Sequence, residues 1–324
     1  MSMITLDILS CHKHKQILEQ AQSQCNLTEI YIGDHLNGFD ETYKNNILEY
    51  INSFASKQHS RITVYTSYVF DNTILQNYAN LDFKCKIFKL FHSFHDYHQH
   101  PALDFKNFIC SFNGSDHVSR KLLIAILNKF KYFNPEYCSK NFAFTVKTLQ
   151  GHVTDYVDQR DNFYHKFFIA DNSDVFFNKI NSFGHVQYDH KRNIYNLEHK
   201  LTQSFLHIVS ETMATSSVPF VTEKFLYSIV TRGLFLSYAQ PGWHDHIEKY
   251  YGFKRYTKLF DYRFDAIQNP VERLVELITM ISKFSHLTPH EWHDLYLLQQ
   301  EEIEYNYDHY FSKNYLNELK KYED

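Results

Sequence analysis

Glycine and proline are scarce in this chain, with 8 and 6 among 324 residues. The dinucleotide-binding pattern G-x-G-x-x-G and the phosphate-binding pattern G-x-x-x-x-G-K-[ST] are both absent, and both patterns use glycine to bring backbone N–H groups against phosphate. The zinc-protease pattern H-E-x-x-H is absent as well. The sequence therefore gives no support to a dehydrogenase with that fingerprint, a P-loop NTPase or a zinc protease of this kind.

Long apolar runs are missing too. No segment approaches the ~20 apolar residues of a membrane-spanning helix, and the start MSMITLDIL is too short and uncharged for a signal peptide. Cysteine is sparse and contains no C-x-x-C pair, with single residues at Cys11, Cys25, Cys85, Cys110 and Cys138. An odd number of cysteines, dispersed along the chain, indicates reduced thiols and not a framework of disulfides. We therefore expect a cytoplasmic protein without a membrane span.

Excess positive charge is also lacking, since the formal net charge is −4. This value argues against broad electrostatic binding of nucleic acid but leaves room for a local basic cleft. The hydrophobic fraction of 44% is ample for two cores. Because 324 residues exceed the usual size of one simple domain, we expect two lobes.

The first half alternates segments of strand and helix period. We predict strands at 3–9, 28–32, 61–68, 85–91, 106–112 and 142–146, and helices at 41–54 and from about residue 117. Ser115 or Asp116 is the expected N-cap of the latter helix. This alternation predicts a doubly wound, Rossmann-like lobe over residues 1–155, with residues 151–174 as the crossing into a second lobe over 156–324.

The most informative stretch runs from residue 205 to residue 265. Residues 205–209 and 233–238 have the length and apolar character of strands. Between them, Thr222 can cap a helix through its hydroxyl, and Pro241-Gly242 opens another helix. The order strand, helix, strand, helix predicts a parallel sheet.

Glu223 and Lys224 occupy the first two positions of the helix that Thr222 caps. Ligands of parallel sheets bind beyond the carboxyl ends of the strands, where helix N-termini present N–H groups to anions. A carboxylate beside an ammonium at such a place suits a nucleotide, with Glu223 on the ribose hydroxyls and Lys224 on the phosphates. The alternative is a surface carboxylate favoured by the helix dipole, beside a solvated lysine.

The tail has two further helix starts. Asn269 caps a helix whose first residue is Pro270, with an apolar stripe behind it. Thr288 and Glu291 form a capping box, from which we predict one long final helix.

The motif VTEK, followed by an apolar helix, a strand and a Pro-Gly helix, resembles the donor-binding half of GT-B glycosyltransferases. The likeness is to the fucosyltransferase-like enzymes and to related glycosyltransferases of phages and large viruses. It continues through YGFKRY, FDYRFD, NPVERLVELI and YNYDHYFS, and covers about residues 204–312. It implies two Rossmann-like lobes, a Glu223 contact to the ribose and a Lys224 position near the pyrophosphate of a UDP- or GDP-sugar.

A second strand–loop–helix corner, FICSFNGSDHVSR, lies in the expected acceptor lobe. Arg120 matches the final arginine of a loop that is common in the related viral enzymes, but Gly114, Ser115 and Asp116 replace the usual basic residues of that loop. Arg120 could pair with the donor diphosphate across the cleft, or it could be an arginine on the helix surface.

Asp116 and His117 are the predicted bases that deprotonate an acceptor hydroxyl. Asp116 is equally well suited to be a helix cap. Asp7, His12 and Asp34, at other strand ends of the first half, compete for the role of base.

Thr222, Tyr238 and Gly242 are the remaining predicted donor contacts, from the cap before Glu223, from the second strand and from the helix after it. The aromatic residues Trp243, Tyr250 and Tyr251 near this helix suit either stacking on a ligand or packing against the sheet. His92, His95, His98 and His100 are close enough in sequence to hold a metal, but in a chain with 21 histidines we predict no metal site. The pattern D-x-D of metal-dependent sugar transferases is absent as well.

Together these features predict an α/β glycosyltransferase with two lobes, and the resemblance to the fucosyltransferase-like enzymes implies that it is inverting and independent of a metal or other cofactor. Its acceptor is either a hydroxymethylated pyrimidine in viral DNA or a glycan, and its site would be cytoplasmic, in the host cytoplasm if the source is a virus. Two other classes stay open, an inactive nucleotide- or sugar-binding module and a structural protein.

Overall fold

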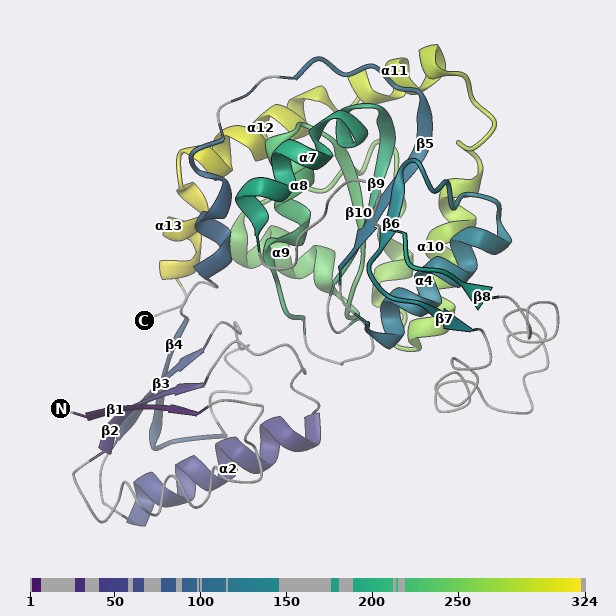
Figure 1. Cartoon of the computed structure of the whole chain (residues 1–324). Coiled ribbons are helices and arrows are strands. Elements are labelled where there is room, and N and C mark those ends of the chain that lie inside the picture. Colours follow the sequence, from purple (N-terminus) through teal and green to yellow (C-terminus); the bar gives the residue numbers. More distant parts are fainter. Residues whose placement is uncertain are drawn as a thin grey trace.

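The structure is a computed structural model and describes residues 2–6, 27–32, 41–57, 61–66, 77–85, 89–97, 99, 101–114, 116–145, 176–180, 189–211, 214 and 219–321. Over these residues the chain is an α/β protein with parallel sheets and covering helices (Figure 1). Within this described part, no helix is both long and apolar enough to cross a membrane. The predicted α/β class is confirmed.

The first four strands form a parallel sheet in the order β1-β2-β3-β4. Helix α2 (Glu41–Lys57) follows β2 in the chain and buries Leu48 and Ile51. Ile62 and Val64 of β3 are buried two residues apart, as one face of a strand requires. The strands are β1 (Ser2–Leu6), β2 (Leu27–Ile32), β3 (Ile62–Thr66) and β4 (Leu81–Cys85).

The strand predicted at 85–91 is wrong. Strand β4 ends at Cys85, and η2 (Lys89–Phe94) is a 3₁₀ helix. Phe91 and Phe94 are both buried, because residues three apart lie on the same side of a 3₁₀ helix. A short apolar run does not distinguish a strand from a buried helical turn.

The second sheet has the order β10-β9-β5-β6 and is parallel throughout. Along the chain, β5 is followed by β6 on one side of it and then by β9 on its other side. The order of strands therefore reverses between β5 and β9, which makes the space beyond their carboxyl ends a topological switch point. The strands are β5 (Asn107–Asn113), β6 (Cys138–Lys140), β9 (Ser204–Ser210) and β10 (Leu234–Tyr238).

The pairing of β5 with β9 corrects the predicted boundary at residue 155. Cys110 of β5 lies opposite His207 of β9, and Ser111 Oγ donates a hydrogen bond to the Ile208 carbonyl at 2.9 Å. Strand β5 thus shares a sheet with the second half of the chain. Sequence period predicts that a strand exists but does not identify its neighbour, so the boundary was placed too late.

The strand predicted at 142–146 is shorter than expected and does not join the sheet of the first lobe. It is β7 (Phe144–Thr145), which pairs antiparallel with β8 (Phe176–Phe177) and extends neither parallel sheet. The predicted crossing at 151–174 lies outside the described residues.

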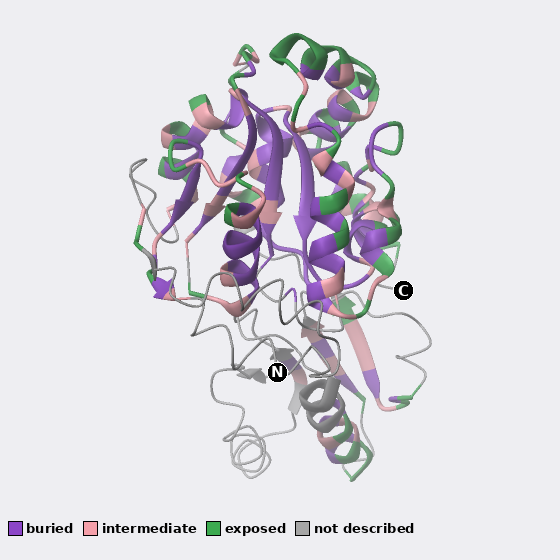
Figure 2. Cartoon of the chain, turned by 90° about the vertical axis from the view of Figure 1, so that its right-hand side faces the viewer, coloured by how far each residue is buried: buried purple, intermediate pink, exposed green. Residues whose placement is uncertain are grey.

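Helices cover both faces of the second sheet, whose strands are buried along most of their length (Figure 2). Helices α4 and α10 contact each other on one face, while α7, α8 and η2 pack together on the other face (Figure 1). These helices are α4 (Val118–Lys129), α7 (His190–Thr202), η4 (Glu223–Phe225), α8 (Leu226–Val230), α9 (Trp243–Tyr251), η5 (Tyr262–Ala266) and α10 (Pro270–Ser282).

The single long final helix that we predicted is wrong, although its capping box is present. Thr288 and Glu291 form that box at the start of α11 (Pro289–Leu297), and the chain then continues as α12 (Gln300–Phe311) and α13 (Asn314–Lys320). Lys313 has a φ of 59°, a left-handed conformation in which a helix ends. A lysine there gives no sequence signal for the break, since glycine or asparagine is the usual residue.

The C-terminal helices return to the segment before β5. Tyr310 donates its hydroxyl to the Phe91 carbonyl at 2.6 Å, and the Tyr315 hydroxyl lies 3.2 Å from His95 Nε2. Tyr315 also packs its ring near Phe91, at 5.9 Å between centroids. The tail therefore packs against η2, which in turn contacts α7, α8 and η4.

Candidate functional site

Two corners of the chain lie beyond the carboxyl ends of β5 and β9. One corner connects β5 to α4 and carries Asp116, His117 and Arg120; the other follows β9 and carries Thr222, Glu223 and Lys224. They flank the switch point of the second sheet, the usual ligand site of an open parallel sheet. We therefore take these two corners as the candidate site.

Thr222 organises the second corner. Its backbone is extended and its Oγ1 accepts a hydrogen bond from the Lys224 N–H at 3.5 Å, so the predicted capping role is confirmed. Lys224 Nζ donates to the same oxygen at 2.8 Å. The lysine side chain therefore folds back over its own helical turn and keeps 21% of its surface exposed.

Glu211 belongs to the site, and our sequence analysis did not select it. It directly follows β9, and its fully buried carboxylate accepts a hydrogen bond from Thr222 Oγ1 through Oε2, at 2.5 Å. Burial raises the pKa of Glu211, as does the nearby Glu223, whereas Lys224 and the Thr222 hydroxyl lower it. A glutamate just after an apolar strand was the signal, which we interpreted only as the end of that strand.

Glu223 faces another residue that the sequence analysis missed. His190, the first residue of α7, places Nε2 3.4 Å from Glu223 Oε1, while its Nδ1 lies 3.0 Å from the Tyr227 hydroxyl. Burial lowers the pKa of His190, and the Glu223 carboxylate opposes this effect. His190 is distant in sequence and has no local motif, so only the packing of α7 against α8 reveals it.

His117 and Arg120 bring the first corner against the second. The pKa of His117 is lowered to about 4, first by burial and then by the positive charges of Arg120 and Lys224. Because Lys224 acts on His117 by charge, the two corners share one electrostatic environment. Arg120 itself is buried. We expected Arg120 to approach the second corner across a cleft between lobes, but both corners extend from strands of a single sheet.

Asp116 is the exposed member of the first corner. Its carboxylate pairs with Lys121 Nζ at 2.6 Å. The predicted cap is not seen, since His117 holds the N-cap position of α4 without a side-chain hydrogen bond. The alternative cap Ser115 lies outside the described residues, as do the competing bases at positions 7, 12 and 34.

Tyr238 does not fit the predicted donor contact. Its side chain is fully buried at the end of β10, and its hydroxyl donates to the Pro270 carbonyl at 3.1 Å. No face of its ring is exposed for a ligand. Trp243, Tyr250 and Tyr251 are buried as well, which supports packing against the sheet for these aromatic residues.

Gly242 precedes α9 as predicted, but the protein already uses the amides there. The Gly242 N–H donates to the Asp265 carbonyl at 2.7 Å, and the His244 N–H donates to Asp265 Oδ2 at 2.9 Å. The Trp243 N–H donates to the Gln240 carbonyl at 3.2 Å. Since η5 packs against the start of α9, these donors do not point at an anion.

Asn113 adds a polar group at the end of β5. It is fully buried, and its Nδ2 donates to Ser111 Oγ at 3.2 Å and to the Ser139 carbonyl at 3.4 Å. Its Oδ1 has no hydrogen-bond partner among the described residues. A buried oxygen left in this state is costly, so Asn113 is a further candidate for the site.

The histidine cluster does not form a described metal site. His92 and His95 stack edge to face at 5.2 Å between ring centroids, and His95 packs against Tyr310, while His98 and His100 lie outside the described residues. Over the described part of the chain, no three side chains of His, Cys, Asp or Glu converge as metal ligands would.

Cys110 and Cys138 are buried, free thiols.

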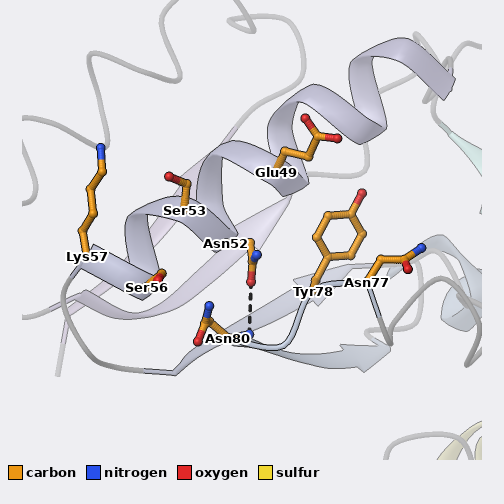
Figure 3. A pocket seen from close by; sticks show the side chains of 8 residues that line it. All are labelled: Glu49, Asn52, Ser53, Ser56, Lys57, Asn77, Tyr78 and Asn80. Atoms are coloured by element: carbon orange, nitrogen blue, oxygen red, sulfur yellow. Dashed lines mark hydrogen bonds between the residues drawn. The ribbon is translucent and has the colours of Figure 1, made fainter.

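A separate groove lies beside the first sheet, between α2 and the residues that lead into β4 (Figure 3). Its lining is polar, and the Asn80 N–H donates to Asn52 Oδ1 within it at 3.0 Å. None of the predicted site residues borders it. The groove is lined by Glu49, Asn52, Ser53, Ser56, Lys57, Asn77, Tyr78 and Asn80.

No protein family, curated protein or solved structure matches this chain.

Proposed function

We propose that the chain is a nucleotide-sugar-dependent glycosyltransferase of GT-B type. The observation that carries the proposal is the pair Glu223 and Lys224 at the switch point of a parallel sheet, where Lys224 and Arg120 both act by charge on His117. This place combines carboxylates that bind hydroxyls with cations that bind phosphate, the two chemistries of a sugar nucleotide. The VTEK resemblance supports the same assignment.

Lys224, whose side chain is 21% exposed, takes the diphosphate of a UDP- or GDP-sugar, and the buried Arg120 adds positive charge at this corner. Their charges stabilise the leaving diphosphate as the glycosidic bond to it breaks, so the reaction requires no metal. Glu223 accepts hydrogen bonds from the ribose hydroxyls, and His190 Nε2 lies 3.4 Å from its carboxylate.

His117 is the favoured base. With a pKa near 4, its imidazole is neutral at pH 7 and has a lone pair for the proton of an acceptor hydroxyl. Arg120 and Lys224 depress this pKa, and a bound diphosphate would offset their charges and raise it. The base would therefore strengthen when the donor is in place. Proton removal lets the hydroxyl attack the anomeric carbon with inversion.

The body formed by β1–β4 and α2 is the acceptor lobe in this proposal, smaller than the lobe of residues 1–155 that we predicted. Closure of the two lobes would exclude water and align the acceptor. A hydroxymethylated pyrimidine in DNA and a glycan are both suitable acceptors. DNA binding weakens steeply as salt rises, whereas binding of a small glycan does not, so a salt titration distinguishes them.

An inactive binding module is the second candidate. It is favoured by the low pKa of His117, which makes this imidazole a weak base before a ligand binds, and by the ion pair with Lys121 that occupies the Asp116 carboxylate. Such a module binds a sugar nucleotide but does not cleave it.

The test is release of UDP or GDP from a panel of sugar nucleotides, measured with and without candidate acceptors. We expect release by the wild type, a loss of roughly 10-fold or more in Lys224→Ala, and wild-type rates in Lys258→Ala, a lysine paired with Glu302 outside the site. Binding without release would favour the inactive module, and the absence of both binding and release would contradict the proposal.

A further inference from the structure

Lys224, Thr222 and Glu211 form a hydrogen-bonded chain with a fixed direction. An ammonium can only donate, so Thr222 Oγ1 is the acceptor in its 2.8 Å bond with Lys224 Nζ. The single hydroxyl proton of Thr222 then points to Glu211 Oε2, 2.5 Å away. Glu211 thus sets the orientation of the hydroxyl, and the hydroxyl sets the position of the ammonium.

The three side chains differ in their access to a ligand. Glu211 is fully buried, whereas the Lys224 side chain keeps 21% of its surface exposed. Glu211 Oε2 and Lys224 Nζ are 3.8 Å apart, longer than the contact of a direct charged hydrogen bond. The Thr222 hydroxyl bridges them and keeps the ammonium from closing onto the buried carboxylate.

We propose that Glu211 is a positioning residue that holds Lys224, through the Thr222 hydroxyl, in place to bind the phosphate groups of the ligand. This inference rests on the proposed function for the identity of the ligand. It adds a residue that does not itself touch the ligand, and it assigns Thr222 the role of a bridge.

Simple electrostatics gives the opposite expectation for Glu211. Removing a carboxylate near an anion site favours the anion, so Glu211→Gln would bind a nucleotide more tightly if the charge of Glu211 only repelled the ligand. If Glu211 positions Lys224, the same substitution weakens binding, because the hydroxyl loses its charged acceptor. The direction of the change therefore separates the two roles.

The binding experiment measures UDP and GDP affinity by calorimetry. We expect Lys224→Ala, Glu211→Gln and Thr222→Val each to weaken binding by roughly 10-fold, the effect of one charged hydrogen bond. Thr222→Ser, which restores the hydroxyl, is expected to recover most of the affinity. In the Lys224→Ala background, Glu211→Gln should cause no further loss, because its effect passes through Lys224.

A second readout needs no ligand. The Lys224 amine is labelled with an acylating reagent, and its rate of modification is compared by mass spectrometry with that of Lys258 in the same sample. Only the neutral amine has the lone pair that attacks the reagent, and the hydrogen bond to Thr222 Oγ1 holds the nitrogen in place as an ammonium. Once this arrangement is lost, the nitrogen can release its proton and approach the reagent, so we expect Lys224 to react several-fold faster in Glu211→Gln and Thr222→Val, with Lys258 unchanged.

The two readouts distinguish the failure of this inference from the failure of the proposed function. If the wild type binds neither UDP nor GDP, the proposed function fails, while faster labelling of Lys224 in the variants still supports the positioning role. Unchanged or tighter nucleotide binding in Glu211→Gln, additive losses in the double variant, or unchanged labelling would overturn it. Should Glu211→Gln fail to fold, nucleotide affinity and Lys224 labelling are compared between Thr222→Val and Thr222→Ser. Equal values in these two variants would overturn the positioning role.

Discussion

The imidazole of His207 lies directly against Gly233. A Cβ atom on this glycine would come within 2.1 Å of His207 Cε1, far inside van der Waals contact. The ring cannot move aside easily, because its nitrogens lie 2.9 Å from Ser228 Oγ and 2.9 Å from the Leu201 carbonyl. Gly233 thus allows β10 to begin at close range to β9.

Gly233→Ala should therefore be strongly destabilising, by about 3 kcal/mol. The control is Gly242→Ala, where a Cβ meets nothing within 4 Å but the φ is +74°, so only backbone strain of about 1 kcal/mol is expected. Urea unfolding of both variants measures the difference. Equal losses would show that steric contact with His207 is not what selects glycine at position 233.

Protonation of His207 should destabilise the fold in acid. Burial lowers its pKa from 6.5 to about 4, so between these values the unfolded chain binds more protons than the folded one. Stability is then complete above pH 6.5 and falls as the pH drops toward 4, by about 3 kcal/mol for this residue. The free energy of unfolding, measured against pH, should have a shallower slope in His207→Gln. If the curves of unfolding free energy against pH had the same slope in the wild type and in His207→Gln, the acid destabilisation would not come from His207.

The hydrogen bond from Tyr310 to Phe91 predicts how firmly the C-terminal helices dock. Tyr310→Phe leaves a carbonyl without its donor, and we expect a loss of about 1–2 kcal/mol in unfolding free energy. Tyr305→Phe is the matched control, since Tyr305 is 41% exposed and should change little. If both variants behaved alike, the docking of α12 on η2 would not depend on this bond.

Local sequence patterns predicted where helices and strands begin better than they predicted which strands pair with one another. The capping residues Thr222, Asn269 and Thr288 all cap as expected, because a cap depends on residues only two or three apart. Pairing depends on residues far apart in the chain, which explains why β5 was assigned to the wrong body. The break at Lys313 was missed because a lysine seldom adopts the left-handed conformation that ends a helix.

The candidate site shows the same difference between local pattern and long-range contact. Glu223 and Lys224 were predicted from their position after a strand, and in the structure Lys224 and Arg120 both act by charge on His117. Glu211 and His190 were missed because their roles depend on contacts between different elements. Tyr238 was wrongly included, since a strand-end tyrosine gives no sequence sign of whether it faces solvent or core.

The measurement that tests the central proposal most directly is a thermal-shift screen against UDP-, GDP-, CMP- and ADP-sugars, with Glu223→Ala and Lys224→Ala beside the wild type. A ligand that binds only the folded state raises the melting temperature by mass action. We predict that one nucleotide family stabilises the wild type, and the control Lys258→Ala, while neither site variant responds. No shift at millimolar ligand, or equal shifts in all variants, would contradict a donor site at Glu223 and Lys224.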